Sequence, residues 1–153
     1  MSNIAFNRVY RFIDENYPED MWFTDDDEIM LEQKGNNSNY DVFIKVKKRM
    51  LSIVIPMPGL FPEDRFSDFA KAICFANCRL EIGRFDMVRE CGIFEFNAST
   101  IFGGRLDDTV IDRLVRTSLA TADRFYPAFY GIIFEDADPE AAIDFVDSEQ
   151  ICH

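Results

Sequence analysis

The residue types that perform most enzymatic chemistry do not stand in catalytic spacings in this chain of 153 residues. Its one histidine, His153, is the last residue, and no serine or cysteine lies in a pattern that would give it a base. Hydrolytic, redox and metal-assisted mechanisms need at least one such group held rigidly by a fold. We therefore predict no catalytic residue, no metal site, no cofactor and no enzymatic activity.

The cysteines and an aspartate triplet were considered as metal ligands. Cys74 and Cys78 stand one helical turn apart, which is half of a zinc site, but no other cysteine pair or histidine completes four ligands. We interpret them as small buried apolar groups. The chain has no CxxC pair among Cys74, Cys78, Cys91 and Cys152, and we expect all four to be reduced. Asp25 to Asp27 lack the alternating ligands and central glycine of a calcium loop.

Carboxylates leave one alternative open. Four of them lie near predicted strands or the predicted long helix, and two could converge in space: Glu81, Asp86, Glu95 and Asp123. The alternative hypothesis is therefore an enzyme or a small-ligand-binding protein with an unrecognised carboxylate site. A closed pocket with buried carboxylates would favour this alternative, whereas a shallow apolar groove would favour a protein-binding module.

The net charge of -12 is concentrated at the two flanks of the chain. Residues 14–32 carry nine acids and residues 135–149 carry seven, with no Lys or Arg in either stretch. The residues between them, 33–134, have 14 basic and 12 acidic side chains. Negative flanks repel phosphates, so we expect neither nucleic acid nor membrane as a partner. Solvated acidic faces are the simplest interpretation, and a site for a basic partner is the alternative.

Length and composition indicate one globular domain, residues 1–153, with an acidic C-terminal extension at about 135–153. Hydrophobic residues make up 48% of the chain and include 16 Phe, which separates it from disordered proteins. No apolar run approaches the ~20 residues of a membrane helix. The first residues lack the basic and hydrophobic regions of an export signal, so we expect a cytoplasmic location.

Apolar periodicity predicts the first half of the fold. Steps of three and four residues indicate a helix at about 2–16, which Pro18 ends. Alternating apolar residues then predict strands at about 29–34, 42–46 and 50–56, with a turn at 35–39. These strands form an antiparallel meander. Lys45, Lys47, Lys48 and Arg49 at its second turn indicate a protected strand end, because no aromatic stacking series accompanies them.

The second half of the chain predicts two helices around a hairpin, and then a short terminal helix. A helix begins after Pro62 and ends near Cys78, and strands follow at about 80–87, with a bulge at Gly83, and 94–98. Asp107 is the expected N-cap of a long helix that Pro127 kinks or splits. A last helix starts near Pro139, with only weak docking by Ile143 and Val146. We therefore predict an α+β fold: helix, three-stranded antiparallel meander, helix, β-hairpin, long C-terminal helix.

Three segments carry a resemblance to a known family: Asn77-Cys78-Arg79-Leu80-Glu81-Ile82-Gly83-Arg84-Phe85-Asp86, the turn at Gly92 leading to Phe94, and Ser118-Leu119-Ala120-Thr121-Ala122-Asp123 before Tyr126-Pro127. With these segments the chain resembles the YbjN family of bacterial sensory transduction regulators over most of residues 22–134. That family is similar in fold to the class I chaperones of type III secretion, small acidic proteins that bind extended partner segments, commonly as homodimers. The resemblance implies a non-enzymatic, protein-binding role and transfers no catalytic residue.

Our first hypothesis is therefore a homodimeric regulator or chaperone-like module that holds a protein or peptide partner on its sheet edge and adjoining apolar surface. Trp22, Phe23, Phe43 and Phe75 are the predicted partner-binding residues, because each lies off the predicted core-facing stripe of its element. Burial beneath the first helix or in a dimer interface is the alternative for the same four side chains.

Overall fold

The computed structural model describes residues 4–25 and 27–151. Their helices and strands follow in the order α1 (Ile4–Asn16), the 3-10 turn η1 (Glu19–Met21), β1 (Trp22–Asp25), β2 (Glu28–Lys34), β3 (Asn39–Lys47), β4 (Met50–Pro56), the 3-10 turn η2 (Glu63–Arg65), α2 (Phe66–Asn77), β5 (Arg84–Val88), β6 (Ile93–Ile101), α3 (Asp108–Phe134) and α4 (Pro139–Ile151).

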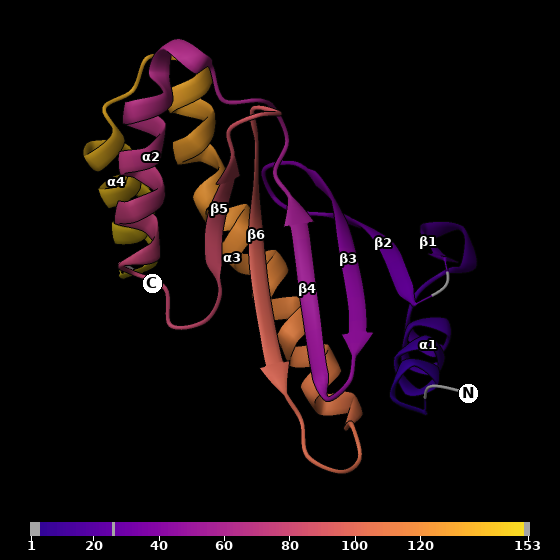
Figure 1. The fold of residues 1–153 in the computed structure, drawn as a ribbon. Coiled ribbons are helices and arrows are strands. Elements are labelled where there is room, and N and C mark those ends of the chain that lie inside the picture. The colour runs from indigo at the N-terminus through magenta and orange to yellow at the C-terminus, as the bar shows by residue number, and fades with distance from the viewer. Residues whose placement is uncertain (1–3, 26, 152–153) are drawn as a thin grey trace.

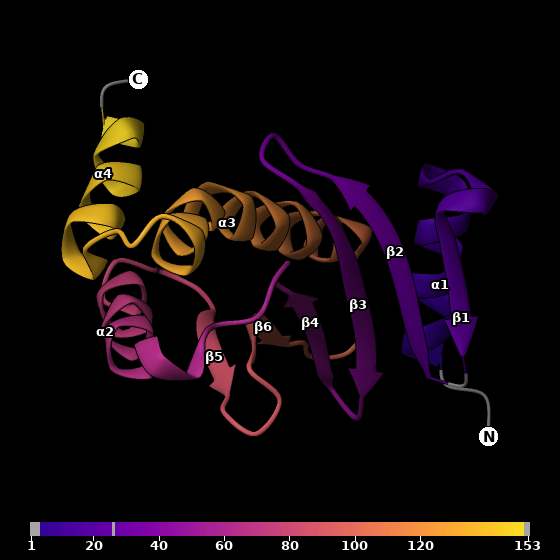
Figure 2. The ribbon, with the colours of Figure 1, turned by 90° about the horizontal axis from the view of Figure 1, so that it is seen from above.

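The six strands form one antiparallel sheet in the order β1-β2-β3-β4-β6-β5. Helix α3 packs against β3, β4 and β6 on one face, with α1 beside it and with α2 and α4 grouped at the β5 side (Figures 1 and 2). No helix among the described residues lies over the opposite face. The predicted α+β class is confirmed.

Strict alternation along the strands explains why this sheet has one buried face. In β3, Tyr40, Val42, Ile44 and Val46 are buried and their neighbours are exposed or half-buried. Strand β4 repeats the pattern with Leu51, Ile53 and Ile55. Successive side chains of a strand point to opposite faces, so every second residue faces α3.

Much of the phenylalanine content fills the layer between sheet and helices. Phe129 of α3 lies within 5.3 Å, centroid to centroid, of the rings of Phe69, Phe85 and Phe94. Aromatic pairs at such distances add to the burial energy through their edge-to-face and offset geometry. Much of the apolar content of the chain is therefore used by the core of a single copy.

Two sequence predictions about strands were wrong. The sequence predicts a meander of three strands, but Trp22–Asp25 forms β1 ahead of them, so the meander has four strands. The prediction failed because four residues that end in acids carry little periodicity. The fourth predicted strand begins only at Arg84, and Leu80 and Ile82 lie in the connection before it. Gly83 is the last residue of this connection. Its φ is +75°, and a Cβ built on it would meet the Phe96 ring, so the position favours glycine.

The interpretation of the cysteines as buried groups was also wrong. Cys74, Cys78 and Cys91 are free and exposed. Cys74 and Cys78 lie on the outer face of α2 and at its C-cap, while Ala72, Ile73 and Ala76 face the core. Cys152 lies outside the described residues.

Helix α3 confirms one prediction about its ends and corrects another about its interior. The Asp107 carboxylate accepts a hydrogen bond from Thr109 N at 2.9 Å, as an N-cap does. Pro127 does not split the helix, which continues from Asp108 to Phe134. The carbonyl that the proline leaves without a helical donor accepts a hydrogen bond from the Asn37 side chain instead, as described below.

Helix α4 packs more firmly than the sequence suggested. Ile143 is completely buried and Val146 nearly so, against α2 and α3. Arg79, in the turn after α2, pairs with Asp144 and, at 3.3 Å, with Asp147, so acids of the C-terminal segment form ion pairs within the fold. No described helix combines the length and the apolar character needed to cross a bilayer.

We predict that Ile143→Ala will lower the free energy of unfolding by about 2–4 kcal/mol, because it leaves a cavity between α4 and α2. Phe145 is on the same helix but 64% exposed, so Phe145→Ala is the matched control and should change stability by less than about 0.5 kcal/mol. Urea denaturation measures both. Equal effects would show that α4 does not belong to the cooperative core.

Candidate functional site

A buried carboxylate fixes the tip of the β2–β3 hairpin to α3. Asp123 is 7% exposed, and its two oxygens accept hydrogen bonds from Asn36 N at 2.8 Å, Asn37 N at 2.9 Å and the Tyr40 hydroxyl at 2.8 Å. Each donor comes from the hairpin and the acceptor from the helix. A carboxylate with three such donors offsets the cost of its burial.

Pro127 completes this attachment. A proline lacks the N–H that would bond the carbonyl four residues earlier, which is that of Asp123. The freed carbonyl instead accepts a hydrogen bond from Asn37 Nδ2 at 2.9 Å. The proline thus opens one acceptor on the helix, and the hairpin tip occupies it.

The tip approaches the helix too closely for a side chain at Gly35. A Cβ built there would lie 2.4 Å from Asp123 Oδ1 and 2.7 Å from the Tyr40 ring. Gly35 N also closes the turn by donating to Ser38 O at 2.8 Å. The turn at 35–39 that the sequence predicted is therefore shaped by its contact with α3.

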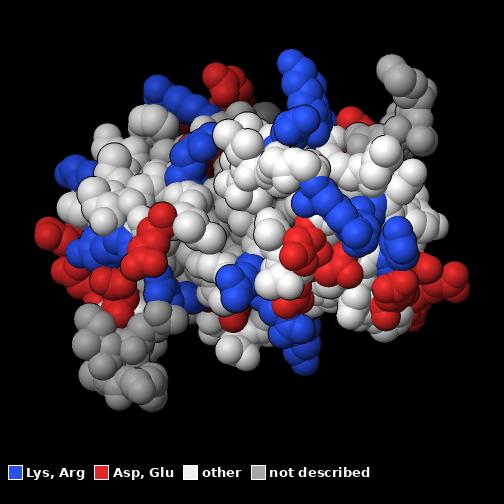
Figure 3. Space-filling model, turned by 90° about the horizontal axis from the view of Figure 1, so that it is seen from below, with Lys and Arg blue, Asp and Glu red and all other residues white. Residues whose placement is uncertain are grey.

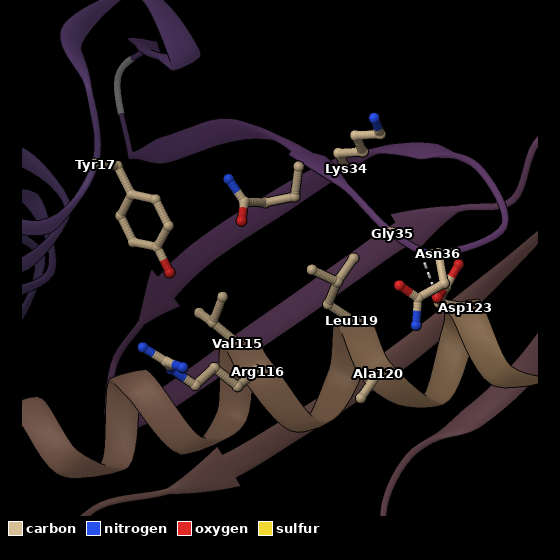
Figure 4. Close-up of a pocket in the computed structure, with 10 residues that line it drawn as sticks. Tyr17, Lys34, Gly35, Asn36, Val115, Arg116, Leu119, Ala120 and Asp123 are labelled. Carbon is tan, nitrogen blue, oxygen red and sulfur yellow. Dashed lines mark hydrogen bonds between the residues drawn. The ribbon is translucent and has the colours of Figure 1, made fainter.

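A hollow of about 390 Å³ lies beside this attachment, between Tyr17, the hairpin and α3 (Figure 4). Two of its charged groups have partners in the fold: Arg116 Nε donates to Asp112 at 2.8 Å, and Asp123 holds the hairpin. The third, Lys34, is exposed at the hairpin. Burial raises the pKa of Tyr17, and Arg116 opposes the rise. The carboxylate of the hollow therefore anchors the hairpin.

The four candidate carboxylates are only partly brought together. Asp86 and Glu95 stand directly opposite each other in β5 and β6, on the face away from α3. Asp86 accepts from Arg84 Nε at 3.0 Å and from Asn97 Nδ2 at 2.6 Å. Glu81 is exposed in the preceding connection, and Asp123 is buried on the other side of the sheet.

This arrangement does not favour the enzymatic alternative. The hollow containing Asp86 and Glu95 is about 490 Å³ and lies on the open sheet surface, lined otherwise by neutral side chains and Arg84. Among the described residues, no three His, Cys, Asp or Glu side chains gather where they could hold a metal ion. A carboxylate pair without a nucleophile or a closed cavity lacks the parts of a catalytic site.

The four aromatic residues predicted to bind a partner lie in three places. Trp22 points to the helix-covered face, because it pairs with buried Leu31, and its ring meets Tyr10 of α1 at 5.3 Å. Phe75 is half-buried on α2 and packs on the core. Phe23 and Phe43 lie on the opposite face of the sheet.

Phe23 and Phe43 belong to a continuous apolar row across the face opposite α3. The register places Phe23 beside Met30, Met30 beside Phe43, and Phe43 beside Val54. We call these four residues the apolar row. Phe23 is 55% exposed and the other three are half-buried. Met30 and Val54 were missed from the sequence, because only strand register shows which residues share a row.

The two edges of the sheet differ. At β5, the Asn77 side chain bonds both backbone groups of Phe85: Phe85 N donates to Asn77 Oδ1 at 2.7 Å, and Asn77 Nδ2 donates to Phe85 O at 3.1 Å. Asn77 thus takes the place of a neighbouring strand. No described strand pairs with the outer side of β1. The unpaired backbone of an edge strand is a template for an added strand.

Acidic side chains surround this open edge. Glu19 and Asp20 lie in the turn before β1, Asp25 ends the strand, and Asp27 and Glu28 begin the return into β2. Thr24 Oγ1 donates to Glu28 O at 3.1 Å, which closes the turn. We call β1 with these acids the acidic edge.

Fold and geometry thus define a small α+β domain with one helix-covered face, one open face and one unpaired edge. The model of the YbjN family, described as "Putative bacterial sensory transduction regulator", matches residues 7–131, and the chain belongs to this family. Among solved structures the chain is similar to that of YbjN, "a putative transcription regulator from E. coli", with a TM-score of 0.58 and 11% identity over 94% of this chain and 92% of that one. No curated protein matches the sequence.

We predict that Asp123→Ala will lower the free energy of unfolding by about 3 kcal/mol, because the buried Tyr40 hydroxyl and two partly buried backbone N–H groups lose their acceptor. Asp41→Ala is the control, since Asp41 is exposed opposite Glu32 and its loss relieves repulsion between like charges. Chemical denaturation measures both variants. If Asp123→Ala were as stable as the control, the attachment would not be holding the hairpin.

The same attachment predicts an alkaline limit to stability. Burial first, and then the bond to Asp123, raise the pKa of Tyr40. The unfolded chain therefore releases this phenol proton at a lower pH than the folded chain. The stabilisation is complete below about pH 10 and is lost as the pH rises above that value. Urea midpoints at increasing pH should fall more steeply for the wild type than for Tyr40→Phe, and parallel curves would contradict the assignment.

Proposed function

We propose that this YbjN-family chain is a non-enzymatic regulator of the cytoplasm that binds a protein partner by strand addition at β1. The single observation that carries the proposal is the difference between the two sheet edges. Asn77 occupies both backbone groups of Phe85 on the β5 edge, whereas the β1 edge has no strand partner among the described residues. An extended segment could bond to the backbone of β1 and gain affinity from main-chain hydrogen bonds.

The apolar row supplies the selectivity of this proposal. A side chain of an added strand on this face would stand beside Phe23, which is 55% exposed, and would extend the row that continues inward through Met30 and Phe43. Aromatic side chains at such positions are frequent centres of binding energy. Trp22 and Phe75 enter the proposal only as supports, because Trp22 packs on Tyr10 and Phe75 on the core.

The acidic edge indicates the charge of the partner. Five acids lie beside or at the ends of β1, and the strand itself contains no basic residue. Opposite charges steer association and fix orientation more than they add affinity. The proposed partner segment is therefore extended, basic and apolar.

We predict that Phe43→Ser will weaken partner binding about tenfold or more, because it removes the centre of the apolar row. Leu60→Ser is the control, since Leu60 is 59% exposed but lies in the loop after β4. Proteins that co-purify with the wild type are identified, and overlapping peptides of each are titrated against both variants. Equal affinities of the wild type and Phe43→Ser would contradict the proposed surface.

Light scattering separates partner binding from a dimer interface on the same surface. The proposed homodimer has twice the 17.8 kDa mass of one chain. If Phe43→Ser keeps the dimer mass but loses the partner peptide, the row is the partner surface. If the variant falls to 17.8 kDa, the row is the dimer interface instead.

A further inference from the structure

A second surface, opposite in charge to the acidic edge, lies where the β3–β4 turn meets the β6–α3 connection. Four cations from three parts of the chain surround a hollow of about 570 Å³: Arg8, Lys48, Arg49 and Arg105. Its floor is apolar, formed by Phe102 and Leu106, and the exposed side chain of Ile4 lines it as well. We call this the basic hollow. Figure 3 looks onto this end of the molecule and shows basic side chains spread across it, with groups of acids between them.

The sequence did not reveal this grouping. Lys45, Lys47, Lys48 and Arg49 are neighbours in the chain, but the fold separates them. Lys45 stands opposite Glu28, whereas Lys48 and Arg49 form the turn and meet Arg8 of α1 and Arg105. Only the folded chain brings cations from positions 8 and 105 to the same rim.

The hollow is held by the fold. Phe102 N donates to Arg49 O at 2.9 Å, which ties the β3–β4 turn to the end of β6. Phe102 and Leu106 are buried, so the floor is part of the core. A volume of this size is within the usual range for sites that take a ligand group.

Lys48 has a backbone conformation that lysine rarely adopts. Its φ is +57°, in the left-handed region that favours glycine or asparagine. A non-glycine residue held there costs stability, and such costs cluster at functional positions. The turn therefore keeps a cation at the rim where a glycine would fold more easily.

The cations are largely without partners of their own. Lys48, Arg49 and Arg105 form no ion pair with any described residue, and Arg8 reaches Asp108 only at 3.7 Å. In a chain of net charge -12, unpaired cations around an apolar floor are complementary to carboxylates that accompany an apolar side chain. The only aromatic ring in the lining is buried Phe102, which leaves no platform for stacking bases. A concave floor also suits an inserted side chain better than a flat lipid surface.

We propose that the basic hollow binds an acidic segment of a protein partner, with an apolar side chain of that segment inserted between Phe102 and Leu106. This surface is distinct from the acidic edge, and the two bind segments of opposite charge. Carboxylates of the segment pair with Lys48, Arg49 and Arg105 at the rim. The domain then joins two different segments, one basic and one acidic.

The test is fluorescence anisotropy with a labelled short peptide of alternating Asp and Leu, titrated with the full chain. Lys48→Gly combined with Arg105→Gln should weaken binding about tenfold or more, and raising the salt should weaken wild-type binding. Lys71→Ala, an exposed cation on α2, is the control and should leave binding unchanged. Since glycine suits the conformation of residue 48, the variant should keep the wild-type urea midpoint, so any loss of binding is not unfolding.

Three outcomes would overturn the proposal: equal affinity of wild type and variant, equal affinity for the same peptide with Asn in place of Asp, or binding only to vesicles containing phosphatidylserine. A peptide with Ser in place of Leu should bind more weakly, and equal binding of this peptide would refute the inserted side chain. Phe43→Ser should bind the acidic peptide as the wild type does. The basic hollow and the strand-addition surface can therefore fail independently.

Discussion

The hydrogen bonds of Asp123 to the β2–β3 hairpin are the contact on which the exposed surfaces of this domain depend. Helix α3 packs on β3, β4 and β6, while β2 and β1 extend the sheet farther. The carboxylate, the carbonyl freed by Pro127 and the Asn37 side chain hold the hairpin tip to the helix. Because β1 pairs only with β2, the position of the open edge follows from that of the hairpin. A charge buried in the fold thereby sets the geometry of a surface on the outside.

The two edges of the sheet differ in whether a side chain occupies their backbone groups. An unpaired edge strand risks aggregation, and folds usually block such an edge. At β5 one asparagine from α2 satisfies both backbone groups of Phe85. At β1 the strand is only four residues long and its ends carry acids, which are features that limit self-pairing. The acids at this edge repel other acidic strands, whereas a basic segment meets no such repulsion.

The sequence predicted what is local and missed what needs a distant partner. Alternation gave β3 and β4, and Asp107 gave the start of α3, because neighbouring residues determine both features. Pro127 signals a break in any isolated helix. The helix is continuous because the Asn37 side chain, ninety positions earlier in the chain, satisfies the carbonyl that the proline leaves free. Asp123 was one of four candidate carboxylates, and its burial separates it from the rest. The apolar row depends on strand register, and the basic hollow depends on segments far apart in the chain that meet in space. No local sequence pattern contains either.

The net charge of -12 does not show that acidic and basic side chains gather on different surfaces of the domain. The acidic edge and the basic hollow are both on one small domain, and at physiological salt the Debye length of about 8 Å confines each field to its own surroundings. The two proposed surfaces can therefore each select a segment of opposite charge, and binding at one leaves the charge of the other unchanged.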